Sequence, residues 1–139
     1  MDPLHVAHLF AVTLWLGLAL AESVLEVGAR DDESRRHAAR LHYRLDMLLE
    51  LPLLIVVLAT GSILAARAWP FTTLHWIKVG CGLGAVLANL GCVVAVVKRR
   101  RQIDDTAALA RYTKMVHMTG LAGPLFLTAL GLGLAYFRA

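Results

Sequence analysis

Residues 8–22, HLFAVTLWLGLALAE, decide the fold class of this 139-residue chain. The stretch carries no Asp, Lys or Arg, and its one carboxylate stands at its end, so the stretch is apolar enough to enter a lipid bilayer. His8, Trp15 and Glu22 are spaced seven residues apart, which puts them close to one line on an α-helix. About 21 Å of helix separates His8 from Glu22, so the two mark different depths of one polar stripe.

Three further stretches share this apolar composition. A spanning helix needs about 20 mostly apolar residues, so each stretch, with a little flank, crosses a bilayer once. The whole chain is 58% hydrophobic and 17% charged, with a mean hydropathy of +0.64, whereas soluble domains carry about 25% charged residues. The windows without Asp, Glu, Lys or Arg are residues 3–21, 51–66, 79–97 and 118–137.

The sequence therefore predicts an all-α integral membrane protein, an up-down four-helix bundle that forms a single domain over residues 1–139. Short connections make consecutive helices antiparallel neighbours. The connection 28–39 is expected to lie between the first two helices, with Asp31, Asp32 or Ser34 as helix caps. We expect helices at about 4–27, 40–67, 73–99 and 110–137.

The basic residues predict the topology. Eleven of the fourteen Lys and Arg residues lie in or beside the first and third connections. The positive-inside rule makes that side cytoplasmic, so both termini are expected on the periplasmic side of a bacterial inner membrane. The placement of these basic residues at helix ends also argues against a nucleic-acid partner. Membrane lipid is the expected partner instead. These residues are Arg30, Arg35, Arg36, Arg40, Arg44, Lys98, Arg99, Arg100, Arg101, Arg111 and Lys114.

The polar residues of the spans divide into two levels. An ionisable side chain at membrane depth costs about 2.5 to 3.5 kcal/mol, so these groups are expected to face the bundle interior. The outer level has His5, His8, His75 and Lys78. The inner level has Glu22, Glu26, His42, Asp46, Glu50 and His117.

Imidazoles at matching depth on facing helices, with small residues nearby, are typical of a b-type haem site. His8 is the candidate haem ligand, with His75 or His117 as a second ligand and Lys78 beside a haem carboxylate. His42 with His117 is a candidate for a second, inner site. The alternative interpretation is that His75 simply lies among lipid headgroups.

The inner level allows three other interpretations. Its carboxylates with His117 resemble the ligand sets of two-metal bundles, although the Glu-x-x-His motifs of those proteins are absent. Glu22, Glu50 and His117 alternatively form a proton or cation relay, with Glu50 as a catalytic group. The simplest alternative pairs the carboxylates with Arg30, Arg44 or Lys114 at the membrane boundary.

Part of the chain resembles known families. The spacing of His8, six residues, Trp15 and then Gly17-Leu18 resembles the first helix of HemJ-type protoporphyrinogen oxidases and, more loosely, of CopD-type copper-resistance domains. The HemJ-like order continues through the rest of the chain. It includes Tyr43-Arg44, Pro52 and Gly61 nine residues apart, Leu74-His75 and Lys78.

The HemJ-like resemblance implies a haem b ligand at His8 and a catalytic role for Lys78. It also implies a membrane oxidoreductase that takes electrons from a porphyrinogen and passes them to quinone. The chain departs from the family pattern after Trp15, where it places Glu22 and Glu26.

The CopD-like resemblance implies a copper or other metal-ion carrier with His8, His75 and His117 as ligands. Soft ligands for copper would come from Met115, Met118 and Cys81 or Cys92. A third expectation is a structural accessory subunit, and in each case the chain is expected to form a homo-oligomer or part of a membrane complex.

Overall fold

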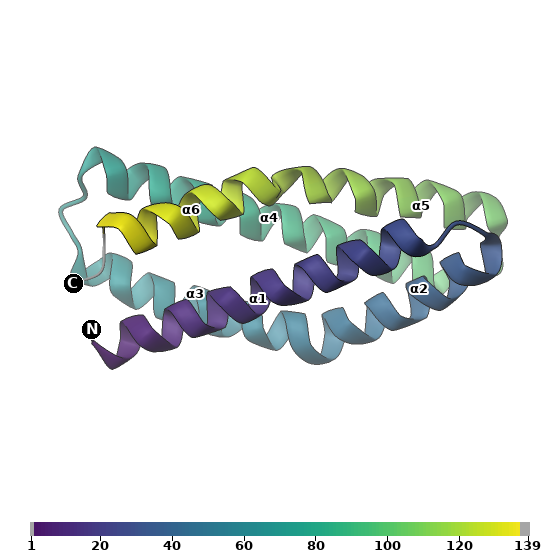
Figure 1. Ribbon diagram of the computed structural model, residues 1–139, viewed down its shortest axis with the longest axis horizontal. Helices are drawn as coiled ribbons and strands as arrows, with labels where there is room; N and C mark the ends of the chain where they lie inside the picture. The colour runs from purple at the N-terminus through teal and green to yellow at the C-terminus, as the bar shows by residue number, and fades with distance from the viewer. Residues whose placement is uncertain (1, 137–139) are drawn as a thin grey trace.

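The computed structural model describes residues 2–136, and over this range the chain is all-helical (Figure 1). Four helical segments of the described chain are long and apolar enough to cross a membrane, which confirms the predicted spans. Residue 137, the expected end of the last helix, lies outside the described residues. The four segments are Pro3–Gly28, Asp32–Arg67, Thr73–Arg101 and Thr106–Tyr136.

The first two segments form a helical hairpin. It consists of α1 (Pro3–Gly28), α2 (Asp32–Leu45), the π-helical turn η1 (Asp46–Glu50) and α3 (Leu51–Arg67). α1 packs along both α3 and α2, as expected for antiparallel neighbours.

The predicted helix start near residue 40 is wrong, because α2 already begins at Asp32, while the cap expected at Asp31 is confirmed. A reciprocal capping box explains the early start. The backbone N–H of Ser34 donates to the Asp31 carboxylate at 2.8 Å, and the backbone N–H of Asp31 donates to Ser34 Oγ at 3.1 Å. The polar first half of this helix therefore extends beyond the apolar span.

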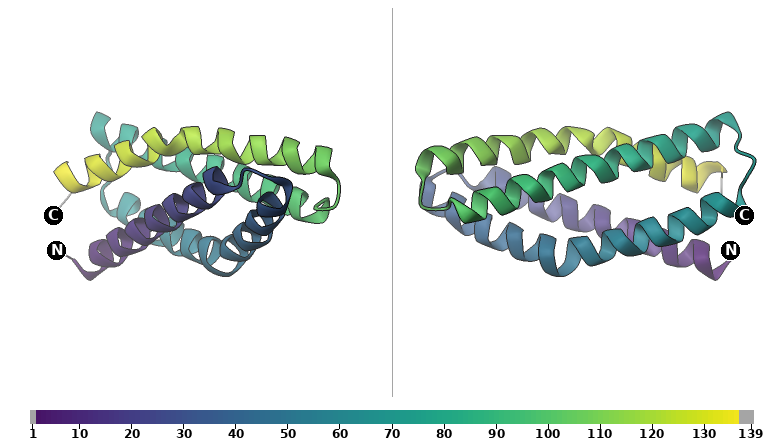
Figure 2. Two further views of the ribbon diagram at one scale, coloured as in Figure 1. Left: turned by 45° about the vertical axis from the view of Figure 1, so that its right-hand side comes forward. Right: turned by 180° about the vertical axis from the view of Figure 1, so that it is seen from behind.

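The bend between α2 and α3 follows from Pro52 (Figure 2). Proline has no N–H to donate, and its ring clashes with the carbonyl one turn earlier. The helix widens there into η1, where the N–H of Leu51 donates to the carbonyl of Asp46, five residues back. Asp46 and Glu50 occupy the two ends of this wide turn.

The second hairpin consists of α4 (Thr73–Arg101), α5 (Thr106–Thr119), the 3₁₀ turn η2 (Gly120–Ala122) and α6 (Gly123–Tyr136). α4 packs along both α5 and α6. Gly84 allows this approach, since a Cβ there would lie 3.2 Å from Leu125 Cδ1. The turn at η2 interrupts the predicted fourth helix just before Pro124, which again lacks a donor.

The two hairpins pack on each other chiefly through α2, which contacts α4 and α5. We call this half, with the connections 29–31 and 102–105, the basic end. The opposite half, the terminal end, carries the start of α1 and the end of α6 (Figure 1). There the hairpins enclose a cavity of about 590 Å³ between α1, α3, α4 and α6.

The distribution of side chains suits a lipid environment. Large apolar residues are exposed on the outside, with Val24 74% and Leu121 77% exposed. The four acidic residues of the predicted inner level, Glu22, Glu26, Asp46 and Glu50, are buried, as predicted from the cost of placing them in lipid. Trp15, Leu54 and Phe126 belong to the apolar core between the two ends.

Candidate functional site

A cluster of buried polar side chains lies at the basic end. α1, α2, η1, α4 and α5 all contribute to it. The predicted inner level is thus confirmed as an interior feature, although His117 is exposed rather than buried. The buried members are Glu22, Glu26, His42, Asp46, Glu50, Arg99 and Thr113.

Arg99 anchors the cluster. Its Nη1 donates to Glu26 Oε2 at 2.8 Å, its Nη2 donates to Glu26 Oε1 at 2.5 Å, and Nη1 also approaches Thr113 Oγ1 at 3.3 Å. The prediction that Glu26 pairs with Arg30, Arg44 or Lys114 is therefore wrong. Those residues are exposed, whereas Arg99 is wholly buried.

Sequence reasoning missed Arg99 because it stands in the run Lys98–Arg101, which reads as a solvated helix end. A signal was present, however. Asn89, Cys92, Val96 and Arg99 follow one another at spacings of three and four residues, so they form one helical stripe. Asn89 and Cys92 also line the smaller of the two cavities described below, so this stripe faces the interior.

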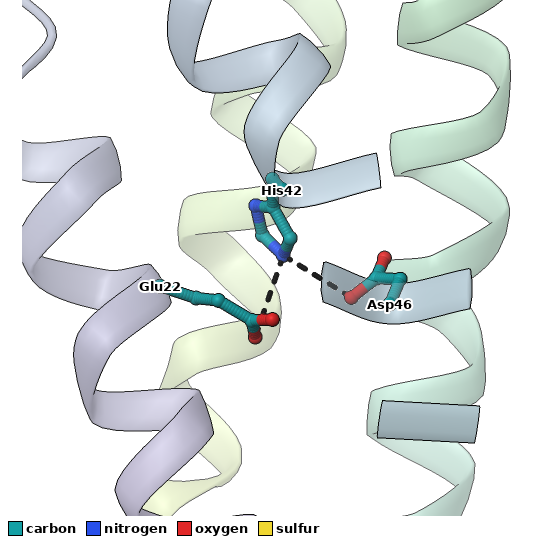
Figure 3. A group of neighbouring side chains, drawn as sticks. All are labelled: Glu22, His42 and Asp46. Carbon is teal, nitrogen blue, oxygen red and sulfur yellow. Dashed lines mark ion pairs between the residues drawn. The ribbon is translucent and has the colours of Figure 1, made fainter. Parts of the chain in front are cut away.

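His42 lies at the centre of the cluster. Its Nδ1 is 2.6 Å from Glu26 Oε1. Its Nε2 is 3.6 Å from Glu22 Oε2 and 3.5 Å from Asp46 Oδ1. Figure 3 shows the two carboxylates converging on this nitrogen from different helical segments.

Trp15 separates the cluster from the terminal end. Its Nε1 donates to Glu50 Oε1 at 3.0 Å. Its ring packs edge-on against Phe126, with centroids 4.7 Å apart. The same two rings line both the cavity at the terminal end and a smaller cavity of about 300 Å³ at the basic end.

The larger cavity brings several predicted residues together. His5, His8, His75 and Lys78 all line it, so the expected outer level forms one site. Its walls are otherwise mostly apolar, and its volume lies within the 300 to 1,000 Å³ typical of ligand and cofactor pockets.

The ring of His8 is fixed by α3. The hydroxyl of Thr60 donates to the Val56 carbonyl at 2.7 Å, so its oxygen is left to accept from His8 Nδ1, 2.8 Å away. In the neutral ring, that bond places the proton on Nδ1 and leaves Nε2 unprotonated. Gly61 makes room for the ring, because a Cβ there would lie 3.1 Å from His8 Cε1.

The other candidate ligands are placed differently. His75 bonds Thr72 Oγ1 through Nδ1 at 2.8 Å, and its ring stacks on Phe71. His117 and His42 both line the smaller cavity, on the other side of Trp15 from His8. His117 therefore does not share the His8 cavity, so of the two predicted second ligands only His75 lies there.

The residues that line the larger cavity are compatible with the predicted haem group. A fixed imidazole with an unprotonated Nε2 is what an axial ligand requires, and a hydrogen bond to the other ring nitrogen is the usual support. Lys78, the predicted partner of a haem carboxylate, also lines this cavity. Comparisons of the chain with protein-family models, curated proteins and solved structures find no match in any of the three.

Proposed function

We propose that the chain is a haem b-binding redox protein of the membrane, with the haem in the cavity at the terminal end. One observation carries the proposal. Thr60 fixes the tautomer of His8, so this imidazole lines a mostly apolar cavity of about 590 Å³ with its Nε2 ready to ligate.

The remaining residues of the cavity have defined tasks in this proposal. His75 would be a second ligand of the haem, and Lys78 would pair with one of its carboxylates. The apolar walls, which include Val57, Val86 and Phe126, exclude water from the ring. The haem iron, when bound, supplies one-electron chemistry, while the protein sets ligation and dielectric.

The proposal extends to the direction of insertion. With the basic end in the cytoplasm, the haem cavity opens towards the periplasm of a bacterial inner membrane. Oxidation of a porphyrinogen with quinone as acceptor stays a prediction of the HemJ-like resemblance.

The copper-carrier and accessory-subunit alternatives also stay predictions. Met115 and Met118 are 43% and 59% exposed, so these candidate soft ligands lie on the outer surface of the bundle. The haem proposal is therefore the one that the geometry favours.

Haem titration of the purified chain in detergent tests the proposal. The wild type should develop a Soret band that saturates at a fixed number of haems per chain. His8→Ala should lose most of this affinity, while His37→Ala, an exposed histidine of α2, should keep it. Equal binding by His8→Ala and the wild type would overturn the assignment of His8.

A further inference from the structure

We propose that Glu22, His42 and Asp46 bind one divalent transition-metal ion of the Zn²⁺ type inside the basic end. This site is separate from the haem cavity and does not depend on it. The ligand atoms are Glu22 Oε2, His42 Nε2 and Asp46 Oδ1, which all lie within 4.8 Å of one another (Figure 3).

Two of the three spacings between the ligand atoms match tetrahedral coordination. Bonds of about 2.0 to 2.2 Å to nitrogen and oxygen, at tetrahedral angles, place neighbouring ligand atoms about 3.4 Å apart. The observed distances from His42 Nε2 are 3.6 Å to Glu22 and 3.5 Å to Asp46. Both are long for a direct hydrogen bond but suit an ion between the atoms.

The carboxylates of this group lack partners of their own. Asp46 is fully buried, and neither of its side-chain oxygens has a hydrogen-bond partner among the described residues. Glu22 is 5% exposed, and its Oε1 is likewise unpartnered. Since an uncompensated buried carboxylate is costly, a cation between the two explains their placement.

The imidazole is oriented as a metal ligand. Arg99 binds both oxygens of Glu26, so this carboxylate is ionised and accepts the proton of His42 Nδ1. The neutral ring then presents the lone pair of Nε2 to Glu22 and Asp46. A carboxylate behind a ligating histidine is the usual outer support of a metal site.

The local charges also call for a cation. Three carboxyl groups approach His42, Glu50 is buried in the same cluster, and Arg99 is the cation buried with them. Both of its terminal nitrogens bond Glu26. Glu50 takes one hydrogen bond, from Trp15. A divalent ion supplies the positive charge that Glu22 and Asp46 lack.

The fold provides both access and precise placement. The cavity of about 300 Å³ reaches Glu22 and His42 and is also lined by the exposed His117, which gives an ion a route from the surface. The wide turn η1 begins at Asp46, and such turns often occur at functional sites.

The donor set selects the class of ion. One imidazole and two carboxylates suit Zn²⁺, Fe²⁺ and Mn²⁺, whereas Cu⁺ prefers thiolate and thioether ligands. Three ligands with short tetrahedral spacing are too few and too close for Ca²⁺, which takes six to eight oxygens. Zn²⁺ and its spectroscopic substitute Co²⁺ are therefore the probes of choice.

The test is metal binding by the full chain in detergent after treatment with a chelator. We expect one Zn²⁺ per chain, and Co²⁺ should give the intense visible bands of a tetrahedral site. Glu22→Gln and Asp46→Asn should each weaken binding by at least about tenfold, because even the loss of outer support costs 10- to 100-fold.

Two matched variants control for the loss of charge. Glu33→Gln and Asp104→Asn change exposed carboxylates at the basic end and should bind as the wild type does. If a variant loses metal binding, thermal unfolding of the metal-free chains shows whether the variant is still as stable as the wild type. Asp46→Asn should then melt no lower than the wild type, since it removes a buried charge, and should no longer be stabilised by Zn²⁺.

Three results would overturn the proposal. They are a wild-type chain that takes up no Zn²⁺ or Co²⁺, equal affinity in the Asp46→Asn and wild-type chains, or a metal-free Asp46→Asn chain that melts well below the wild type. The last would show that Asp46 is stabilised by a protonated His42 instead. None of these results bears on haem binding, so this site and the haem proposal succeed or fail separately.

Discussion

Arg99 and Glu26 form a bidentate ion pair that is buried inside the bundle, with nitrogen to oxygen distances of 2.8 and 2.5 Å. The pair joins α4 of one hairpin to α1 of the other. It also receives His42 from α2, so three helices meet at this point. The contact fixes the basic end, where the hairpins pack most closely.

Removing one partner of this pair should destabilise the fold strongly. Arg99→Ala leaves Glu26 as a buried carboxylate without its cation, and breaking a buried pair costs about 3 to 5 kcal/mol. Chemical unfolding in detergent, followed by circular dichroism, measures the loss. Arg100→Ala, the exposed neighbour on the same helix, should change stability by under about 0.5 kcal/mol. Similar losses for the two variants would contradict the structural role of Arg99.

Thr60→Val should weaken haem binding while leaving the cavity nearly the same size. Valine cannot accept the proton of His8 Nδ1, and loss of such a bond typically costs 10- to 100-fold in affinity. Haem titration measures the effect. Thr128→Val is the matched control, because Thr128 also bonds the carbonyl four residues back but belongs to α6, on the other hairpin. Unchanged haem affinity in Thr60→Val would show that the bond does not orient the ligand.

Gly61→Ala should also weaken haem binding, through sterics. The new Cβ would lie 3.1 Å from His8 Cε1, so the ring must move from its present position. Gly80→Ala provides the control, since a Cβ at Gly80 meets nothing within 4 Å. Haem titration of both variants at one temperature compares their haem affinities. Equal affinities would mean that haem binding does not depend on the present position of the His8 ring.

Trp15→Phe should lower stability without removing the aromatic contact to Phe126. The variant loses the N–H that donates to Glu50 Oε1 at 3.0 Å, and a buried acceptor without its donor costs about 1 to 3 kcal/mol. Glu50→Gln in the Trp15→Phe background should recover part of the loss, because the carboxamide carries no charge. A double variant less stable than Trp15→Phe alone would contradict this explanation.

The four spans could be predicted from the sequence because four apolar windows of sufficient length stand between charged segments. The choice of Asp31 among the expected caps and the break in the fourth helix at η2 could not be predicted from the sequence. The first depends on the capping box of Asp31 and Ser34, which competes with other possible caps nearby. The second depends on how the chain absorbs Pro124 within a packed bundle.

The composition of the two polar levels was also predictable, because helical spacing places the polar residues of each span on one face. Their contacts were not. Sequence spacing gives the depth of His8 and His75, but not the hydrogen bond from Thr60 that selects a tautomer. It likewise places Arg99 on the same helix face as Asn89 and Cys92, but it does not identify Glu26 as the partner of Arg99.

The absorption spectrum of the chain extracted from bacterial membranes tests the central claim most directly. Iron analysis and conversion to the pyridine complex identify the haem and count it. We predict a Soret band with the spectrum of haem b, iron in a fixed ratio to the chain, and loss of both in His8→Ala. A folded chain that carries no Soret band and gains none when haem is added would contradict the claim.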